Sequence, residues 1–116
     1  MNHLHYFRLL RVALTVSFCG AMVAVNAQEV DVAAAEALAK KSNCTKCHSV
    51  SAKKDGPAYK VTAEKFKGKA DAEATLIKHL KTGPKIKIDG VEEEHQIVKS
   101  KDDAEIKNLV RYILSR

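Results

Sequence analysis

The stretch Cys44-Thr45-Lys46-Cys47-His48 (CTKCH) decides how this 116-residue sequence is interpreted. Two residues separate the cysteines, and a histidine follows the second cysteine directly. One turn of helix would bring the two thiols to one edge of a flat cofactor and project the imidazole beneath its centre. C-x-x-C-H is the spacing at which two cysteines attach a c-type haem and the histidine binds its iron. We therefore predict one covalent haem c, attached through Cys44 and Cys47, with His48 as an axial ligand.

Other kinds of site also use closely spaced cysteines. Two cysteines in an exported protein often form a disulfide. A thioredoxin-like redox pair needs a βαβ pattern, and none is visible in the sequence. A zinc site needs two further ligands, which His79 and His95 could supply. The helical order of the sequence and its N-terminus favour haem, and a disulfide or a zinc site remains the alternative.

The N-terminal residues have the pattern of an export signal. Arg8 and Arg11 precede an apolar run over residues 12–25, which is too short to span a bilayer. The run ends in Val-Asn-Ala, with a small residue at Ala27. We predict that residues 1–27 are a cleaved signal peptide and that residues 28–116 form one periplasmic domain without stable membrane insertion. An uncleaved membrane anchor is the alternative.

The predicted mature chain is mildly basic. Removal of Arg8 and Arg11 lowers the count of Lys plus Arg from 20 to 18, against 14 acidic residues, which leaves a formal charge of about +4. Two haem propionates would lower this to about +2. Only two arginines remain and they form no cluster, so the composition does not favour binding to nucleic acid.

Apolar periodicity and capping residues predict an all-α domain. We expect a first helix over residues 30–42, a short helix over 58–66 that ends at Gly68, and a third over 71–82 that Asp71 caps and Gly83-Pro84 ends. A last helix begins at Asp102 or Asp103. Residues 49–56 and 85–101 are predicted loops, the second with a turn at Asp89-Gly90.

Two of these helices carry apolar stripes. The first has its stripe at Ala34, Ala35, Leu38 and Ala39. The last has a broader face made of Ile106, Leu109, Val110, Ile113 and Leu114. Because an 89-residue chain buries little apolar surface by itself, a covalent haem would complete the core. The predicted fold is three to five helices wrapped around one haem.

The sequence resembles the short bacterial class I cytochromes c over residues 33–115. The resemblance rests on AEALAKKSNCTKCHSVSAKKDGPAYKVTAEKFKGK (35–69), ATLIKHLKTG (74–83) and LVRYILS (109–115). It implies that the carbonyl of Pro57 accepts a hydrogen bond from His48 and that Pro57 and Tyr59 line the haem pocket. It also implies that the first and last helices cross, with Leu109, Tyr112 and Ile113 near residues 34–38.

The sequence departs from this family at the sixth iron ligand. The family's usual methionine, in a Met-Pro-Pro segment, falls near residues 95–98, where this sequence reads His-Gln-Ile-Val. The only methionines, Met1 and Met22, lie in the predicted signal peptide. We predict that His95 replaces the methionine and lowers the reduction potential, because methionine raises the potential of haem iron. The alternatives are His79, a lysine (Lys85, Lys87 or Lys99), and an open or water-bound iron.

These features predict a one-electron carrier rather than an enzyme, since no catalytic acid or base is visible. A protein that binds or senses CO, NO or O2, or a weak peroxidase, is the alternative if the sixth position is labile. The protein would act as a monomer or as a subunit of a larger oxidoreductase. Its expected partners are redox proteins with an acidic docking surface, which would meet the lysines at positions 46, 53, 54, 60, 85 and 87. Glu92 to Glu94 form an acidic patch of no assigned purpose.

Overall fold

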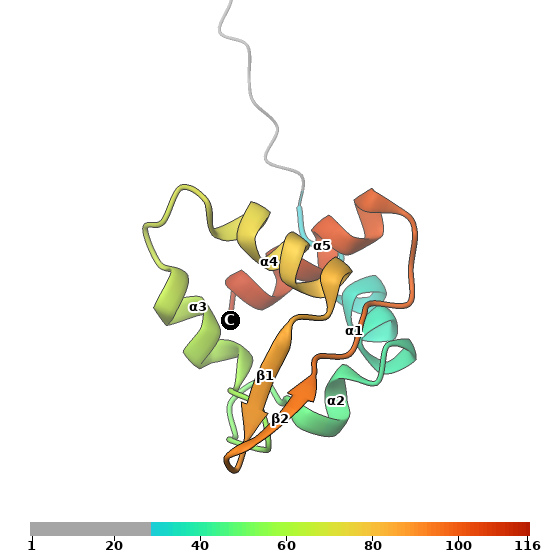
Figure 1. The fold of residues 1–116 in the computed structure, drawn as a ribbon. Coiled ribbons are helices and arrows are strands. Elements are labelled where there is room, and N and C mark those ends of the chain that lie inside the picture. The colour runs from blue at the N-terminus through green and yellow to red at the C-terminus, as the bar shows by residue number, and fades with distance from the viewer. Residues whose placement is uncertain (1–28) are drawn as a thin grey trace, which may run out of the picture.

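A computed structural model of the protein describes residues 29–116, so the predicted signal peptide lies outside the described residues. Five helices and one hairpin follow in the order α1 (Val32–Lys41), α2 (Cys44–Cys47), α3 (Tyr59–Phe66), α4 (Ala72–Thr82), β1 (Lys85–Ile88), β2 (Val91–Glu94) and α5 (Asp103–Leu114). Figure 1 shows the helices gathered in one body, with the hairpin at one edge. The predicted helical class is confirmed. None of the helices in this part of the chain is long and apolar enough to cross a membrane.

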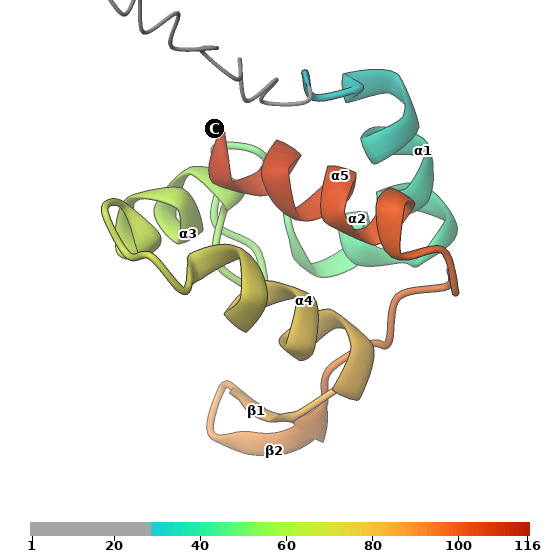
Figure 2. The ribbon, with the colours of Figure 1, turned by 90° about the horizontal axis from the view of Figure 1, so that it is seen from above.

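Helix α5 is the centre of the core. Its apolar face is fully buried at Ile106, Leu109 and Val110, each 0% exposed. Helices α1, α3 and α4 all pack against α5, as Figure 2 shows from above. Because the predicted face of α5 meets three helices at once, this one helix organises the domain.

The crossing of α1 and α5 that the resemblance implies is confirmed. Ala35 and Ala39 of α1 are buried against α5, and their small side chains let the two helices approach closely. At one end of the contact, the backbone N–H of Asp31 donates to the side chain of Asn108, which donates back to the carbonyl of Asp31. Ala34, which we placed on the buried stripe, is exposed.

The helix ends explain the boundaries. Asp31 and Asp102 cap α1 and α5, because each side chain accepts a backbone N–H of the first turn. Asp71 occupies the same position before α4, but its carboxylate accepts the hydroxyl of Thr75 and no backbone N–H, so its predicted capping role is only partly met. Gly83, in the left-handed conformation at φ 56°, ends α4 as predicted.

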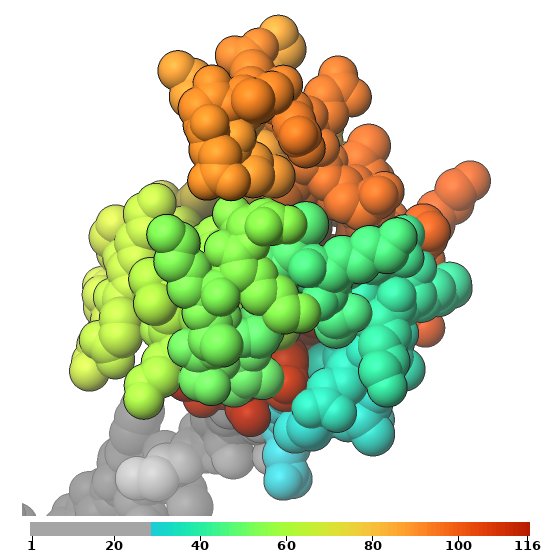
Figure 3. Space-filling view, turned by 90° about the horizontal axis from the view of Figure 1, so that it is seen from below, coloured from blue at the N-terminus to red at the C-terminus, as the bar shows by residue number. Residues whose placement is uncertain are grey.

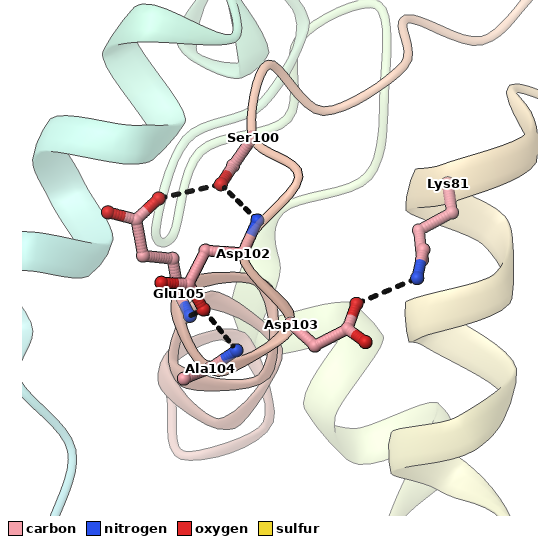
Figure 4. A network of polar contacts seen from close by, with 6 residues as sticks. All are labelled: Lys81, Ser100, Asp102, Asp103, Ala104 and Glu105. Carbon is pink, nitrogen blue, oxygen red and sulfur yellow. Dashed lines mark hydrogen bonds and ion pairs between the residues drawn. The ribbon is translucent and has the colours of Figure 1, made fainter.

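The segment before α5 is fastened by polar side chains, as Figure 4 shows. Ser100 Oγ donates to Glu105 and accepts the N–H of Asp102. Lys81 Nζ lies 2.7 Å from the carboxylate of Asp103, which links α4 to the start of α5. These contacts fix residues 100–103, which lead into α5, and tie them to α4.

The predicted loop over residues 85–101 is wrong in its first half, which forms a β-hairpin. Strands β1 and β2 pair antiparallel with Ile88 opposite Val91. Asp89 and Gly90 connect them with φ values of 49° and 86°, the two positive values of a type I′ turn. The sequence pattern does not predict the hairpin, because only Ile86 and Ile88 alternate with polar residues. The second strand is VEEE, which has little strand propensity.

Candidate haem site

The two cysteines lie on α2, a single turn of helix that is separate from α1. Asn43 separates the two helices, since its left-handed backbone (φ 60°) ends one helix and starts the next. Cys44 and Cys47 are both half-buried free thiols, so the structure does not support the alternative of a disulfide between them. Burial raises the pKa of the Cys44 thiol, with a smaller opposing effect of a backbone hydrogen bond. The short helix thus places both thiols one turn apart, as the haem attachment motif requires.

His48 follows α2 directly and is held by its neighbours on the chain. Its backbone N–H donates to the carbonyl of Cys44, and its Nδ1 lies 2.7 Å from the carbonyl oxygen of Pro57. The contact with Pro57 confirms the hydrogen bond that the resemblance implies. It fixes the tautomer of the ring, because Nδ1 carries the proton and leaves Nε2 as the donor to a metal.

Gly56 allows this arrangement because it has no side chain. A Cβ at Gly56 would lie 2.5 Å from Cε1 of His48, which is inside van der Waals contact. The N–H of Gly56 also donates to the carbonyl of Cys47 at 2.8 Å. The loop after the attachment motif therefore folds back against the imidazole.

Tyr59 packs against the His48 ring. The two rings are stacked, with 5.8 Å between their centroids, and Tyr59 meets Tyr112 of α5 edge to face at 6.1 Å. The hydroxyl of Tyr59 is buried without a hydrogen-bond partner in the protein, and burial raises its pKa. The GPAY segment thus connects the attachment motif to the hydrophobic core.

His95 approaches His48 from a distant part of the chain. It follows β2 directly, and its ring centroid lies 6.0 Å from that of His48 with the ring planes tilted by 50°. Burial, together with the nearby His79 and His48, lowers the pKa of His95. The lowered pKa favours the neutral imidazole, which is the form that binds metal.

His79 of α4 lies against His95, a contact that the sequence analysis did not predict. Their ring centroids are 4.3 Å apart in an edge-to-face arrangement. Burial is the main cause that lowers the pKa of His79. The other proposed ligands differ, because Lys85, Lys87 and Lys99 are all exposed and Lys85 pairs with Glu92 at 2.7 Å.

The chemistry of these residues fits a haem iron between His48 and His95. Two imidazole rings 6.0 Å apart, together with the free thiols of Cys44 and Cys47, form the donor set that would hold a haem and bind its iron. Figure 3 shows the hairpin as a lobe that stands beside the segment following α2. Within residues 29–116, no cluster of three or more His, Cys, Asp or Glu side chains could hold a metal ion, so the zinc alternative has no ligand set there.

Comparison with known proteins identifies a family. The family model described as "Cytochrome c" matches residues 32–116, which include every helix of the structure. Cytochrome c-552 of Hydrogenobacter thermophilus is 42% identical over 80 residues, which cover 69% of this chain and 79% of that protein. Cytochrome c-551 of Pseudomonas aeruginosa is 48% identical over 48 residues, and this match covers 41% of this chain and about half (46%) of that protein.

Solved structures agree with this assignment. The class 1 cytochrome MtoD of Sideroxydans lithotrophicus ES-1 is 56% identical, with a TM-score of 0.72 over 75% of this chain and 97% of that one. Wild-type cytochrome c552 of Nitrosomonas europaea is 34% identical, with a TM-score of 0.55 over 69% of this chain and 96% of that one. The predicted class I fold and covalent haem are thereby confirmed, and this protein belongs to the cytochrome c family of small haem-bearing electron carriers, which are not enzymes.

Proposed function

We propose that this protein is a periplasmic one-electron carrier whose haem iron is bound by His48 and His95 and has a low reduction potential. Bound haem supplies the iron that cycles between the ferric and ferrous states. Cys44 and Cys47 would attach the haem covalently, and His48 and His95 would bind its iron. The export signal predicted for residues 1–27 supports the periplasmic location.

One observation carries this proposal: the ring of His95 lies 6.0 Å from the ring of His48. No methionine occurs after position 22, so a methionine ligand is excluded if the signal peptide is removed. His95 is half-buried in the loop where the family's usual methionine is expected. His79 supports it from α4 through the edge-to-face contact.

The low potential follows from the chemistry of the ligand. Histidine donates more strongly to ferric iron than methionine, so a second histidine favours the oxidised state. A change of 100 mV corresponds to about 2.3 kcal/mol for one electron. The carrier would therefore serve a redox step at lower potential than its methionine-ligated relatives.

The first experiment is a visible spectrum of the reduced, haem-loaded protein before and after addition of CO. We expect no change for the wild type, since two histidines fill both axial positions. His95→Ala should bind CO promptly, while His79→Ala, which removes the neighbouring histidine, should stay inert. Prompt CO binding by the wild type would contradict His95 ligation, and CO binding by His79→Ala alone would assign the sixth position to His79.

A second candidate function is the reversible binding of a small ligand such as CO, NO or O2, or a weak peroxidase activity. One observation favours it: Nδ1 of His95 is buried without a hydrogen-bond partner, whereas Nδ1 of His48 bonds to Pro57. A ligating histidine without such a partner is held less firmly. The same CO experiment separates the two candidates, because a sensor or peroxidase needs a sixth position that opens readily.

The partners belong to the same proposal. The lysines at positions 46, 53, 54, 60, 85 and 87 are all exposed, and a basic rim would steer an acidic redox partner. We expect the rate of electron exchange with an acidic partner to fall as ionic strength rises. Gel filtration with candidate partners would distinguish a free monomeric carrier from a subunit of a larger oxidoreductase.

A further inference from the structure

The chain that carries His95 is fastened across the C-terminal end of α4. The N–H of His95 donates to the carbonyl of Pro84 at 2.9 Å, and the N–H of Val98 donates to the carbonyl of Leu80 at 2.9 Å. Val98 and Leu80 are both buried in the core. These two backbone bonds lie on either side of Gly83 in the fold and set how close residues 95–98 come to the helix.

Gly83 lies directly against residues 95 and 97. A Cβ at this position would lie 2.6 Å from the carbonyl oxygen of His95 and 2.7 Å from Cγ1 of Ile97. The Ile97 side chain is 50% exposed and can rotate away. The carbonyl oxygen of His95 is backbone, so it can move only if residue 95 moves with it.

Within residues 29–116, two other glycines have a left-handed backbone and provide a contrast. Gly68 (φ +73°) and Gly90 (φ +86°) have no neighbouring atom within 4 Å of a built Cβ. A side chain at either position meets only the backbone strain that a positive φ imposes. Gly83 combines that strain with a contact on the residue that we propose as the sixth ligand.

We infer that Gly83 is a positioning residue for the sixth iron ligand, because the absence of a side chain there allows the His95 backbone to rest on the end of α4. This inference rests on the proposed function, in which His95 binds the iron. Gly83 would act only through His95. Its effect should therefore appear in the axial ligation of the iron, in addition to any effect on the stability of the fold.

The test compares Gly83→Ala with Gly68→Ala in the haem-loaded protein. Both variants strain a left-handed backbone, and only the first displaces residue 95. We expect the hold of His95 on the iron to weaken about 10- to 100-fold in Gly83→Ala, the range for loss of a residue that orients a metal ligand. CO uptake by the reduced protein should accelerate accordingly and the reduction potential should shift, while Gly68→Ala should match the wild type in both measurements.

Each outcome separates this inference from the proposed function. A wild type that binds CO promptly contradicts His95 ligation itself. An inert wild type, together with a Gly83→Ala variant that is as inert as Gly68→Ala and has the same potential, overturns the positioning role and leaves ligation standing. If Gly83→Ala does not accumulate as folded protein, Gly83→Asn and Gly68→Asn replace the pair, because asparagine tolerates the left-handed backbone and still presents a Cβ to His95.

Discussion

His48 and His95 lie 6.0 Å apart but are held in different ways. His48 is the last residue of the C-x-x-C-H motif, and the carbonyl of Pro57, nine residues further on, fixes its ring. His95 stands 47 positions beyond His48, on a chain that returns from a hairpin, and its Nδ1 has no hydrogen-bond partner. Local sequence therefore determines where His48 lies, whereas the place of His95, which we propose as the sixth ligand, depends on long-range packing and should be the easier one to change.

The largest expected effect comes from replacing His95, the proposed sixth ligand. His95→Met should raise the reduction potential on the order of 100 mV, because methionine favours ferrous iron and axial ligands move haem potentials over about 0.8 V. Protein-film voltammetry measures the shift, with His79→Met as the matched control that should leave the potential nearly unchanged. An unchanged potential in His95→Met would show that residue 95 does not bind the iron.

The sequence predicts the parts of this site that depend on neighbouring residues, and it misses those that depend on residues distant in the chain. The roles of Cys44, Cys47 and His48 depend on residues within one helical turn, so the motif alone points to them. The Pro57 contact came from the GPAY resemblance and the structure contains it. The edge-to-face contact of His79 with His95 joins α4 to the residue after β2, and no local pattern records such a contact.

The hairpin and the segment that follows it show the same limit of prediction from sequence for the fold. Helices α1, α4 and α5 have strong apolar periodicity and capping residues, and they appear within two residues of the predicted bounds. The strands are four residues each and are stabilised by pairing with one another, which a single stretch of sequence does not reveal. Ser42 is fully buried because its hydroxyl accepts the N–H of Lys99, another partner that is distant in sequence.

The second-largest expected effect tests the packing around His48. Gly56→Ala should destabilise the haem-loaded protein by about 2 kcal/mol, a typical cost of overpacking, because the new Cβ would press on the imidazole. Chemical denaturation followed by far-UV circular dichroism measures the loss. Because Gly56, unlike Gly90, has no left-handed backbone, the comparison is with the wild type, and a Gly56→Ala variant as stable as the wild type would contradict the close packing around His48.

The third expected effect concerns the ion pairs that join α4, the helix next to His95, to α5. Glu73 of α4 accepts a hydrogen bond from Arg111 at 2.9 Å and pairs with Lys107 at 3.3 Å, and the Arg111 bond is the main cause that lowers the pKa of Glu73. Because the folded state holds the carboxylate more tightly than the unfolded state, this stability is present above the ordinary pKa of about 4.5 and is lost as pH falls through the lowered value.

Glu73→Gln should therefore cost up to about 1 kcal/mol at neutral pH, since the pair is only partly shielded from solvent. The difference from the wild type should shrink as the pH falls below about 4.5. Denaturation at several pH values measures both. Glu64→Gln, which affects only the exposed contact with Lys67 at 3.9 Å, is the matched control, and an equal cost for the two variants would show that the link between α4 and α5 adds nothing to stability.

The smallest expected effect lies on the hairpin itself. Lys85 and Glu92 form an ion pair at 2.7 Å with side chains 71% and 54% exposed. Such surface pairs contribute at most about 1 kcal/mol to stability and often nothing measurable. Lys85→Gln should therefore lower the free energy of unfolding by no more than a few tenths of about 1 kcal/mol. It should leave the rate of CO uptake unchanged. Lys87→Gln removes the same charge from the same strand, so it corrects for long-range electrostatics. If Lys85→Gln opened the iron to CO and Lys87→Gln did not, the cross-strand pair would be part of what holds His95, and the His95 side would depend on side chains of the hairpin as well as on its backbone bonds to α4.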